Sequence, residues 1–358
     1  MNKQVLVWLA MAGLTAVDIG KLAVEFVDLE EVVTASRKQL VFSGLSEIKV
    51  NKLIGYRDKI SVIEAKQQLN QLEVSAITTF ETTYPDKLKQ IASAPYVLFV
   101  RGNLDIFNKP SLAVVGTRKP SSYGKQVTEK LVRELVASDL VIVSGLAYGI
   151  DAYAHRQTLE DGGVTIAVLG NGIDAIQPRA HTSLGRKLLE KGAIVSEYPP
   201  GMPGLIQNFP ARNRLVAGMT LGTVVVEGAE NSGSLITARF AKQFKRPVFA
   251  VPGMITNPMS LGPHTLIQNG AVLLRNVTDI HNKLFSKNVS GLTQQDLSSI
   301  VFDTKEKQVV IELLKVEPRT TDELLRLSGI DINQISSTIT ELELEGYVQR
   351  DQNKLFLK

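Results

Sequence analysis

The chain has 358 residues, of which 44% are hydrophobic, so it is long enough for two or three domains with apolar cores. It has no cysteine, which excludes disulfides, thiolate zinc sites and cysteine nucleophiles and fits a reducing cytoplasm, where we expect the protein to act. Its net charge of +4 is uneven. Residues 111–285 hold 18 Lys and Arg against 12 Asp and Glu, whereas residues 1–110 hold 13 against 12 and residues 304–358 hold 8 against 10. A polyanionic partner for the central region would explain this excess, although a solvated basic surface has the same signature.

The first segment, Lys3 and Gln4 followed by VLVWLAMAGLTAV, has the composition of a secretory signal with a cleavage box at residues 10–12. We favour a buried first helix, because the run is too short to cross a bilayer and apolar residues continue beyond it at helical spacing. Further short helical periodicities predict a small helical, SAM-like domain over residues 1–72. Its stretch Ser43–Ile54 reads as a hairpin of two helices, which we expect to serve packing rather than contact with a nucleic-acid backbone.

The central region, residues 73–285, alternates apolar strands with helical stretches. Such near-continuous apolar strands are typical of a doubly wound, Rossmann-like and mostly parallel sheet covered by helices on both faces. Ligands of such sheets bind beyond the carboxyl ends of the strands. The predicted strands are Tyr96–Val100, Leu112–Val115, Leu140–Val143, Thr165–Leu169, Ala193–Ser196, Thr223–Val226, Val248–Val251 and Ala271–Leu274.

A polar linker at residues 286–300 precedes a predicted winged-helix domain at residues 301–358. Its pattern is three helices followed by two strands that form a wing, with a turn near residues 351–353. Thr320 or Thr321, followed by Asp322 and Glu323, marks the start of the second helix. The third, at residues 331–345, contains four acidic residues and no Lys or Arg, so we expect this domain to bind protein or modulate the centre rather than read duplex DNA.

The first central strand ends in GTRKPSSYG, residues 116–124. Its glycine permits a tight turn, and Ser121 or Ser122 is placed to cap the next helix. Arg118 projects over the strand ends, where it can hold a phosphate, although pairing with a carboxylate is the alternative.

The second strand ends in SGLAYGIDAYAH, in which Gly145 and Gly149 would allow close approach of a ligand. Asp151 and His155 lie four residues apart on one helix face. A metal pair is conceivable there, but no third ligand follows at suitable spacing, so we expect a hydrogen-bonded structural pair.

The third strand leads to GNGIDA at residues 170–175, which matches the dinucleotide pattern GxGxxA. The fingerprint belongs on the first strand and must open a helix, whereas Pro178 interrupts this one within a turn. We therefore expect neither NAD nor FAD, nor any other cofactor or metal.

Two arginines and a Ser-Gly-Ser segment follow, and we expect them at the same edge of the sheet. Arg212 and Arg214 offer planar donors, and residues 232–234 open a helix whose first backbone N–H groups favour an anion. Phe209, at the end of a proline-rich loop, either stacks on a base or anchors the loop.

Glu227, after the fifth strand, would stabilise a sugar cation if the chain were a nucleotide N-glycosidase. It lacks a partner carboxylate, and we instead expect an ion pair with one of the arginines. His264 is a further residue that could face a ligand, but an ordinary surface histidine is the simpler interpretation.

These motifs together resemble the DNA-processing protein A family (DprA, also called Smf). The similarity spans residues 111–279 and rests on motifs in the family's order. They are GTRKPSSYG, SGLAYGIDAYAH, TIAVLGNGID, SEYPPG, FPARNRLVAG, VVVEGAENSGSLITA, FAVPG and LIQNGA. The chain departs from the family at Gln177, His181 and His264, where Tyr, Asn and Asn are common.

The resemblance implies a single-stranded DNA-binding protein, not an enzyme, that protects incoming DNA and helps load a RecA-type recombinase during natural transformation and recombination. It also implies a homodimer. Two alternatives stay open: a phosphoribohydrolase-like nucleotide-binding enzyme, which would normally carry PGGxGT where this chain has EGAENSGS, and a winged-helix transcription regulator. The phosphate-binding positions implied by the resemblance are Arg118, Ser144, Gly145, Arg212, Asn213, Arg214, Ser232, Gly233 and Ser234.

Overall fold

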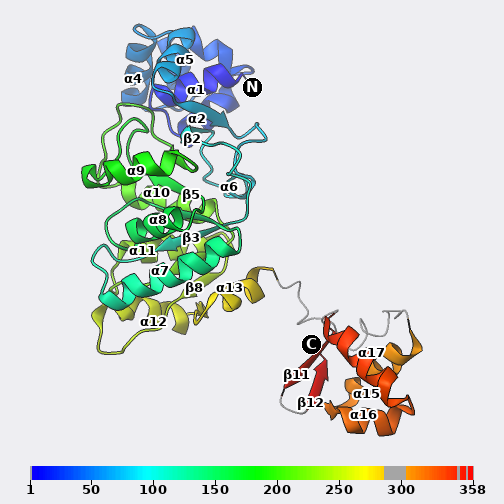
Figure 1. The fold of residues 1–358 in the computed structure, drawn as a ribbon. Helices are drawn as coiled ribbons and strands as arrows, with labels where there is room; N and C mark the ends of the chain where they lie inside the picture. The colour runs from blue at the N-terminus through cyan, green and yellow to red at the C-terminus, as the bar shows by residue number, and fades with distance from the viewer. Residues whose placement is uncertain (1, 286–303, 345–346, 352–353, 358) are drawn as a thin grey trace. The chain divides into compact units, whose positions relative to one another are not determined.

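The computed structural model describes residues 2–285, 304–344, 347–351 and 354–357 (Figure 1). The chain divides into two compact units, residues 1–284 and residues 285–358. The predicted linker at residues 286–300 lies outside the described residues, and so does most of the predicted wing turn. No described helix has the length and hydropathy that crossing a bilayer requires.

Unit one is built on a nine-stranded sheet with the order β1-β2-β6-β5-β4-β3-β7-β8-β9. The pairs β1–β2 and β2–β6 are antiparallel, and the other neighbours are parallel. All seven strands predicted after residue 110 are present. The strands are β1 Ser75–Thr78, β2 Val97–Gly102, β3 Ser111–Val115, β4 Val141–Ser144, β5 Thr165–Leu169, β6 Ala193–Ser196, β7 Thr223–Val225, β8 Val248–Ala250 and β9 Val272–Leu273.

Helices cover both faces of this sheet. Every residue of β3 to β8 is therefore buried. One face packs on α10 and α11 through Leu215 and Ala238, and the other packs on α7 and α8 through Leu131 and Ala154. The helices are α6 Asp86–Lys89, α7 Ser122–Ala137, α8 Ile150–Glu160, η2 Arg179–His181, α9 Thr182–Leu189, α10 Asn208–Gly218, α11 Gly233–Gln243, η3 Pro258–Ser260, α12 Leu261–Gln268 and α13 Val277–Leu284.

The N-terminal helices form their own cluster, which is continuous with the sheet core near β2, β5 and β6. The first helix is buried through residues 5–10, as the sequence predicts. The elements are α1 Lys3–Met11, α2 Ala16–Glu25, η1 Leu29–Val33, α3 Arg37–Phe42, α4 Glu47–Arg57 and α5 Val62–Gln71.

The hairpin predicted near Ser43–Ile54 has a second copy earlier in this helical part, which the sequence did not predict. The tripeptides at residues 13–15 (GLT) and 44–46 (GLS) each have a glycine in the left-handed region, with φ of +79° and +83°. In each, the leucine is buried and the hydroxyl residue caps the following helix.

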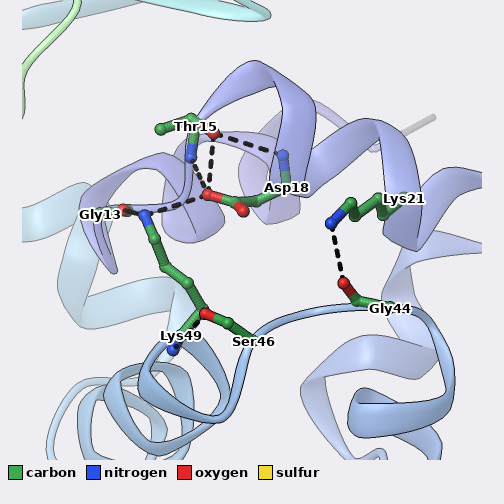
Figure 2. A network of polar contacts seen from close by, with 7 residues as sticks. All are labelled: Gly13, Thr15, Asp18, Lys21, Gly44, Ser46 and Lys49. Carbon is green, nitrogen blue, oxygen red and sulfur yellow. Dashed lines mark hydrogen bonds and ion pairs between the residues drawn. The ribbon is translucent and has the colours of Figure 1, made fainter.

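The two hairpins are tied to each other by lysines, as Figure 2 shows. Lys21 Nζ donates to the carbonyl oxygen of Gly44 over 2.8 Å, while Lys49 Nζ donates to that of Gly13 over 3.0 Å. Lys49 also pairs with Asp18 at 3.0 Å. These lysines therefore link the two hairpins through backbone and carboxylate acceptors within the domain.

Unit two is a small winged helix with its own apolar core, formed by residues such as Ile311, Leu324, Ile339 and Leu355. A capping box between Thr320 and Glu323 starts its second helix, as predicted. Its elements are α15 Lys305–Val316, β10 Arg319–Thr320, α16 Thr321–Ser328, α17 Ile332–Leu344, β11 Val348–Asp351 and β12 Lys354–Leu357. The predicted fold class is therefore confirmed: N-terminal helices, a mostly parallel α/β sheet and a C-terminal winged helix.

Candidate functional site

A pocket of about 570 Å³ lies beyond the carboxyl ends of β3, β4 and β5. The loops after these strands supply one wall, and α10 and the start of α11 supply the other. Seven of the nine residues implied as phosphate-binding line it. They are Arg118, Gly145, Arg212, Asn213, Ser232, Gly233 and Ser234.

Arg118 is exposed and makes no hydrogen bond or ion pair within the described part of the chain. Its loop is nevertheless fixed, because Ser121 caps α7 by accepting from Gly124 N at 3.1 Å. Gly149, at φ +77°, fixes the loop from the other side, since a Cβ there would meet the Arg118 backbone at 2.6 Å. The guanidinium is thus an unpaired cation on a positioned loop.

Arg212 forms a buried cationic wall of the pocket and is only 5% exposed. Its Nη1 donates to the carbonyl oxygens of Gly145, at 2.7 Å, and of Val168. Gly145 permits this approach, because a Cβ would lie 2.5 Å from the guanidinium. Burial lowers the pKa of Arg212 to about 10, and nearby Asp151 opposes that shift, so the group stays charged at neutral pH.

The start of α11 completes the anion-receptive side of the pocket. The Ser232 and Ser234 hydroxyls lie 2.8 Å apart, and Gly233 is exposed with open space around its Cα. Asn213 Nδ2 donates to the Gly233 carbonyl oxygen at 3.2 Å, which ties α10 to this helix start. Ser232 Oγ accepts from Ser234 N at 3.4 Å, and Leu235 N donates to the Ser232 carbonyl oxygen at 3.0 Å. The Gly233 N–H is the one among these that no hydrogen bond of the described residues occupies, and Gly233 lines the pocket, where a helix N-terminus favours an anion.

Two of the implied residues lie elsewhere. Ser144 is fully buried, and its hydroxyl donates to the Val114 carbonyl oxygen over 2.7 Å. Arg214 is paired with Glu197 at 2.6 Å, with both side chains mostly buried, and does not line the pocket. We therefore assign both residues to the structure around the pocket.

The expected pair between Asp151 and His155 is wrong. Asp151 accepts from Gly145 N at 3.1 Å and Ala147 N at 3.4 Å, so it braces the β4–α8 turn. Burial raises the pKa of Asp151, while Arg212 opposes the shift. His155 instead bonds through Nδ1 to Thr165 Oγ1 at 2.7 Å. The Asp151 carboxylate bonds to the turn and not to His155, because two backbone N–H groups of the turn donate to it.

The expected ion pair of Glu227 with an arginine is also wrong. Glu227 is 1% exposed and accepts from Ser121 N at 2.9 Å, Ser121 Oγ at 2.6 Å and Asn257 Nδ2 at 3.3 Å. It does not line the pocket. Sequence spacing could not reveal this, because the two residues lie 106 positions apart.

Two aromatic rings line the pocket. Phe209 is partly buried, and its ring fills the space beside Gly170 and Gly204, where a Cβ would meet it at 2.9 and 3.3 Å. Tyr148, which the sequence analysis did not single out, is 49% exposed and packs edge-on against His181 with ring centroids 5.0 Å apart. An aromatic residue directly before a glycine-opened helix at a strand end was the available signal.

The positions that depart from the family have defined places. Gln177 lines the pocket, and His181 is buried with Nδ1 2.9 Å from the Leu146 carbonyl oxygen. His264 Nε2 lies 3.0 Å from the Gly253 carbonyl oxygen, outside the pocket. His181 thus packs against the Tyr148 ring, whereas His264 bonds to the loop after β8.

The residues that line the pocket suit the binding of an anion. Asp151 is the one carboxylate among the described residues that line it, and backbone N–H groups already hold that group. The same lining includes no histidine, lysine or cysteine that could activate a serine hydroxyl. It does combine two guanidinium groups, a helix N-terminus and two aromatic rings, which suits a phosphate-bearing ligand with unsaturated rings.

Sequence comparisons match this architecture. Residues 75–285 match the model of the family described as DNA recombination-mediator protein A, and residues 297–353 match the DprA winged helix domain. Protein Smf from Synechocystis is 31% identical over 97% of this chain and 96% of its own. Protein Smf from Escherichia coli is 39% identical over 74% of this chain and 72% of its own.

Solved structures give the same result. DNA processing protein A from Streptococcus pneumoniae has a TM-score of 0.69 at 35% identity and covers 79% of this chain and 98% of its own. The protein from Helicobacter pylori, reported for its single-stranded DNA binding mode, has a TM-score of 0.54 at 29% identity and covers 59% of this chain and 95% of its own. The chain therefore belongs to the DNA recombination-mediator protein A family, whose members are also named DprA or Smf.

Proposed function

We propose that this chain binds single-stranded DNA in the pocket between the β3 and β4 loops and the start of α11. The observation that carries the proposal is an exposed, unpaired Arg118 held over a pocket that also contains the buried Arg212 and the first turn of α11. Guanidinium groups and backbone N–H donors hold phosphates without reading base sequence. Low sequence preference and a strong dependence on salt are therefore expected.

The aromatic rings favour a single strand over a duplex. A base can stack on an exposed ring only when it is not already stacked in a duplex, and each such contact is worth about 1–3 kcal/mol. Tyr148 presents the more accessible face, because Phe209 is wedged beside Gly170 and Gly204.

The biological role proposed with this binding is protection of incoming DNA and loading of a RecA-type recombinase during natural transformation and recombination, in the cytoplasm and as a homodimer. Support comes from membership of the recombination-mediator family and from the Helicobacter pylori relative, reported for its single-stranded DNA binding mode. The positions proposed to contact phosphate are Arg118, Gly145, Arg212, Asn213, Ser232, Gly233 and Ser234. Ser144 and Arg214 do not line the pocket, and we propose that they stabilise the structure around it.

Neither alternative function is favoured by a specific observation. A phosphoribohydrolase would need a free carboxylate at the pocket. Asp151 lines the pocket but accepts from the backbone N–H groups of Gly145 and Ala147, and Glu227 does not line it and accepts from Ser121 and Asn257. A duplex-reading regulator would need cations on α17, which has none along its length.

The decisive test is the Arg118→Ala variant of the full chain with a labelled oligothymidylate, measured by fluorescence anisotropy at two salt concentrations. The affinity should fall about tenfold, and the slope of log K against log salt should drop by about 0.7, as one lost phosphate contact requires. The matched control is Arg186→Ala, since Arg186 is exposed on α9 and does not line the pocket. Equal affinity of the Arg118→Ala variant and the wild type would contradict the proposal.

A further inference from the structure

A second groove of about 540 Å³ runs along α11 beside the DNA pocket. The two spaces share Ser232 and Ile236 in their linings, so the groove leaves the pocket at the start of the helix. The rest of the groove lies between α11 and α12. It is lined by Leu235, Ala238, Arg239, Lys242, Arg246 and Asn269, among others.

The groove is lined by two exposed cationic side chains that make few contacts within the described residues. Arg239 is exposed and has no hydrogen bond or ion pair within the described ranges. Lys242 is exposed and makes one long hydrogen bond, 3.4 Å, to the Asn269 carbonyl oxygen. Glu230, at the pocket end, is the one carboxylate among the described lining residues. The balance of charge therefore suits a polyanion.

A third cation is fixed in place. Arg246 donates from Nη1 to the carbonyl oxygens of Ala217 and Thr220, at 2.7 and 2.8 Å, and from Nη2 to that of Lys87 at 2.6 Å. It ties the segment between α11 and β8 to the end of α10 and to α6, so we do not count it as a ligand-binding group. Arg239 and Lys242 are the cations free to move toward a ligand.

Helical spacing puts these groups in one row. Ser232, Ile236 and Arg239 are four and three residues apart, so they share a helix face, and Lys242 continues it one turn on. At 1.5 Å per residue, Lys242 lies about 15 Å along the axis from Ser232. The row therefore leads from the anion-receptive helix start away from the pocket.

We propose that a single strand too long for the pocket continues into the α11 groove, where Arg239 and Lys242 contact its phosphates. The inference rests on the proposed function, because the strand enters from the DNA pocket. It adds a subsite that matters only for strands longer than the pocket holds. An acidic protein segment would suit the same charges, and the test separates the two occupants.

The test uses the full chain with the double substitution Arg239→Ala and Lys242→Ala, and with oligothymidylates of about 5 and about 20 nucleotides. Alanine suits both positions, which lie on an exposed helix face. The matched control is Lys130→Ala with Arg133→Ala. These residues have 69% and 64% exposed side chains on α7, form only surface pairs, and line neither space.

The double variant should bind the short strand as the wild type does and the long strand about tenfold more weakly. Its salt slope for the long strand should fall by about 1.4, which is about 0.7 for each of two phosphates. Arg239→Glu should weaken long-strand binding further. The control should match the wild type for both lengths.

Equal long-strand affinity of the double variant and the control would overturn the inference. If Arg118→Ala still weakened both lengths in that case, the proposed function would survive. If the wild type bound neither strand, or if Arg118→Ala had no effect, the proposed function would fail and the inference with it.

Discussion

The hydroxyl of Ser121 donates to Oε1 of Glu227 over 2.6 Å, and the backbone N–H of the same serine donates to Oε2 over 2.9 Å. This pair joins the start of α7 to the segment after β7 and so fixes the loop that carries Arg118. Glu227 comes two residues after β7, so its carboxylate is held at the end of a buried strand of the sheet. The residue that most resembles a catalytic acid in the sequence is therefore a brace.

Glu227→Gln should lower the free energy of unfolding by about 1–3 kcal/mol, because a charge-assisted acceptor becomes neutral and one amide group faces a backbone donor. Urea denaturation measures this, with the exposed Glu230→Gln as the control for a lost charge. The folded variant should still bind oligothymidylate. Release of free base from a nucleotide by the wild type, abolished by this substitution, would refute the structural role.

Arg212→Ala should differ from Arg118→Ala in stability. Removing the Arg212 guanidinium leaves the Gly145 and Val168 carbonyl oxygens without its donors and leaves buried Asp151 without a neighbouring cation. We expect a loss of about 3 kcal/mol or more, whereas Arg118→Ala should change stability by less than about 0.5 kcal/mol. Urea denaturation of both variants decides the matter. Equal stabilities would contradict the buried role of Arg212.

The sequence predicted the sheet well because its signals are local. Apolar runs such as residues 112–115 and 165–169 are buried on both faces, and a glycine follows each of these two strands. The same logic placed Arg118 and Ser232 at one sheet edge, since all these parallel strands end there.

The hydrogen-bond and ion-pair partners of the buried charged side chains could not be predicted in the same way. Glu227 bonds Ser121, and Arg214 bonds Glu197, because of strand order and loop paths that no local pattern encodes. The repeat at Gly13 and Gly44 could not be predicted from the sequence, because the two copies are alike only in a tripeptide and the helices on either side differ in composition. Exposure also had to come from the structure, which shows Arg212 buried and Tyr148 open.

Tyr148→Ala should weaken binding of single-stranded DNA by about 1–3 kcal/mol, the worth of one stacked base. Tyr148→Phe should bind like the wild type, because stacking needs the ring alone. Anisotropy titrations with oligothymidylate measure both variants. Phe209→Ala is the comparison, and it should also lower the unfolding temperature, since that ring fills space beside Gly170. Equal binding by the alanine and phenylalanine variants of Tyr148 would exclude the stacking role.

His155 should make the stability of unit one sensitive to acid. Thr165 donates its hydroxyl hydrogen to the Ile142 carbonyl oxygen at 2.7 Å, so His155 Nδ1 must carry the hydrogen of the bond it shares with Thr165. The His155 Nε2 atom is then bare, buried and without a partner in the described structure. Burial, helped by nearby His181 and Arg212, lowers the pKa of His155 to about 3.

Because the pKa of His155 in the folded state lies below the ordinary value of 6.5, the unfolded chain takes up a proton first as the pH falls. Stability is complete above pH 6.5 and should drop by about 2 kcal/mol by about pH 5 from this residue alone. His155→Phe should remove that part of the pH dependence in urea denaturation. A variant with the same acid sensitivity as the wild type would show that other groups cause it.

The winged helix should not bind duplex DNA. Its helix α17 buries Ile335, Ile339 and Leu342 against the core, and its acidic residues include Glu341, which pairs with the buried Lys307 at 3.1 Å. With no Lys or Arg along α17, its outer face would repel a phosphate backbone. The isolated residues 300–358, which include a complete apolar core, should therefore leave the anisotropy of a labelled duplex unchanged, while residues 1–285 should bind oligothymidylate as the full chain does. Saturable duplex binding by the isolated domain would contradict this prediction and assign DNA recognition to unit two as well.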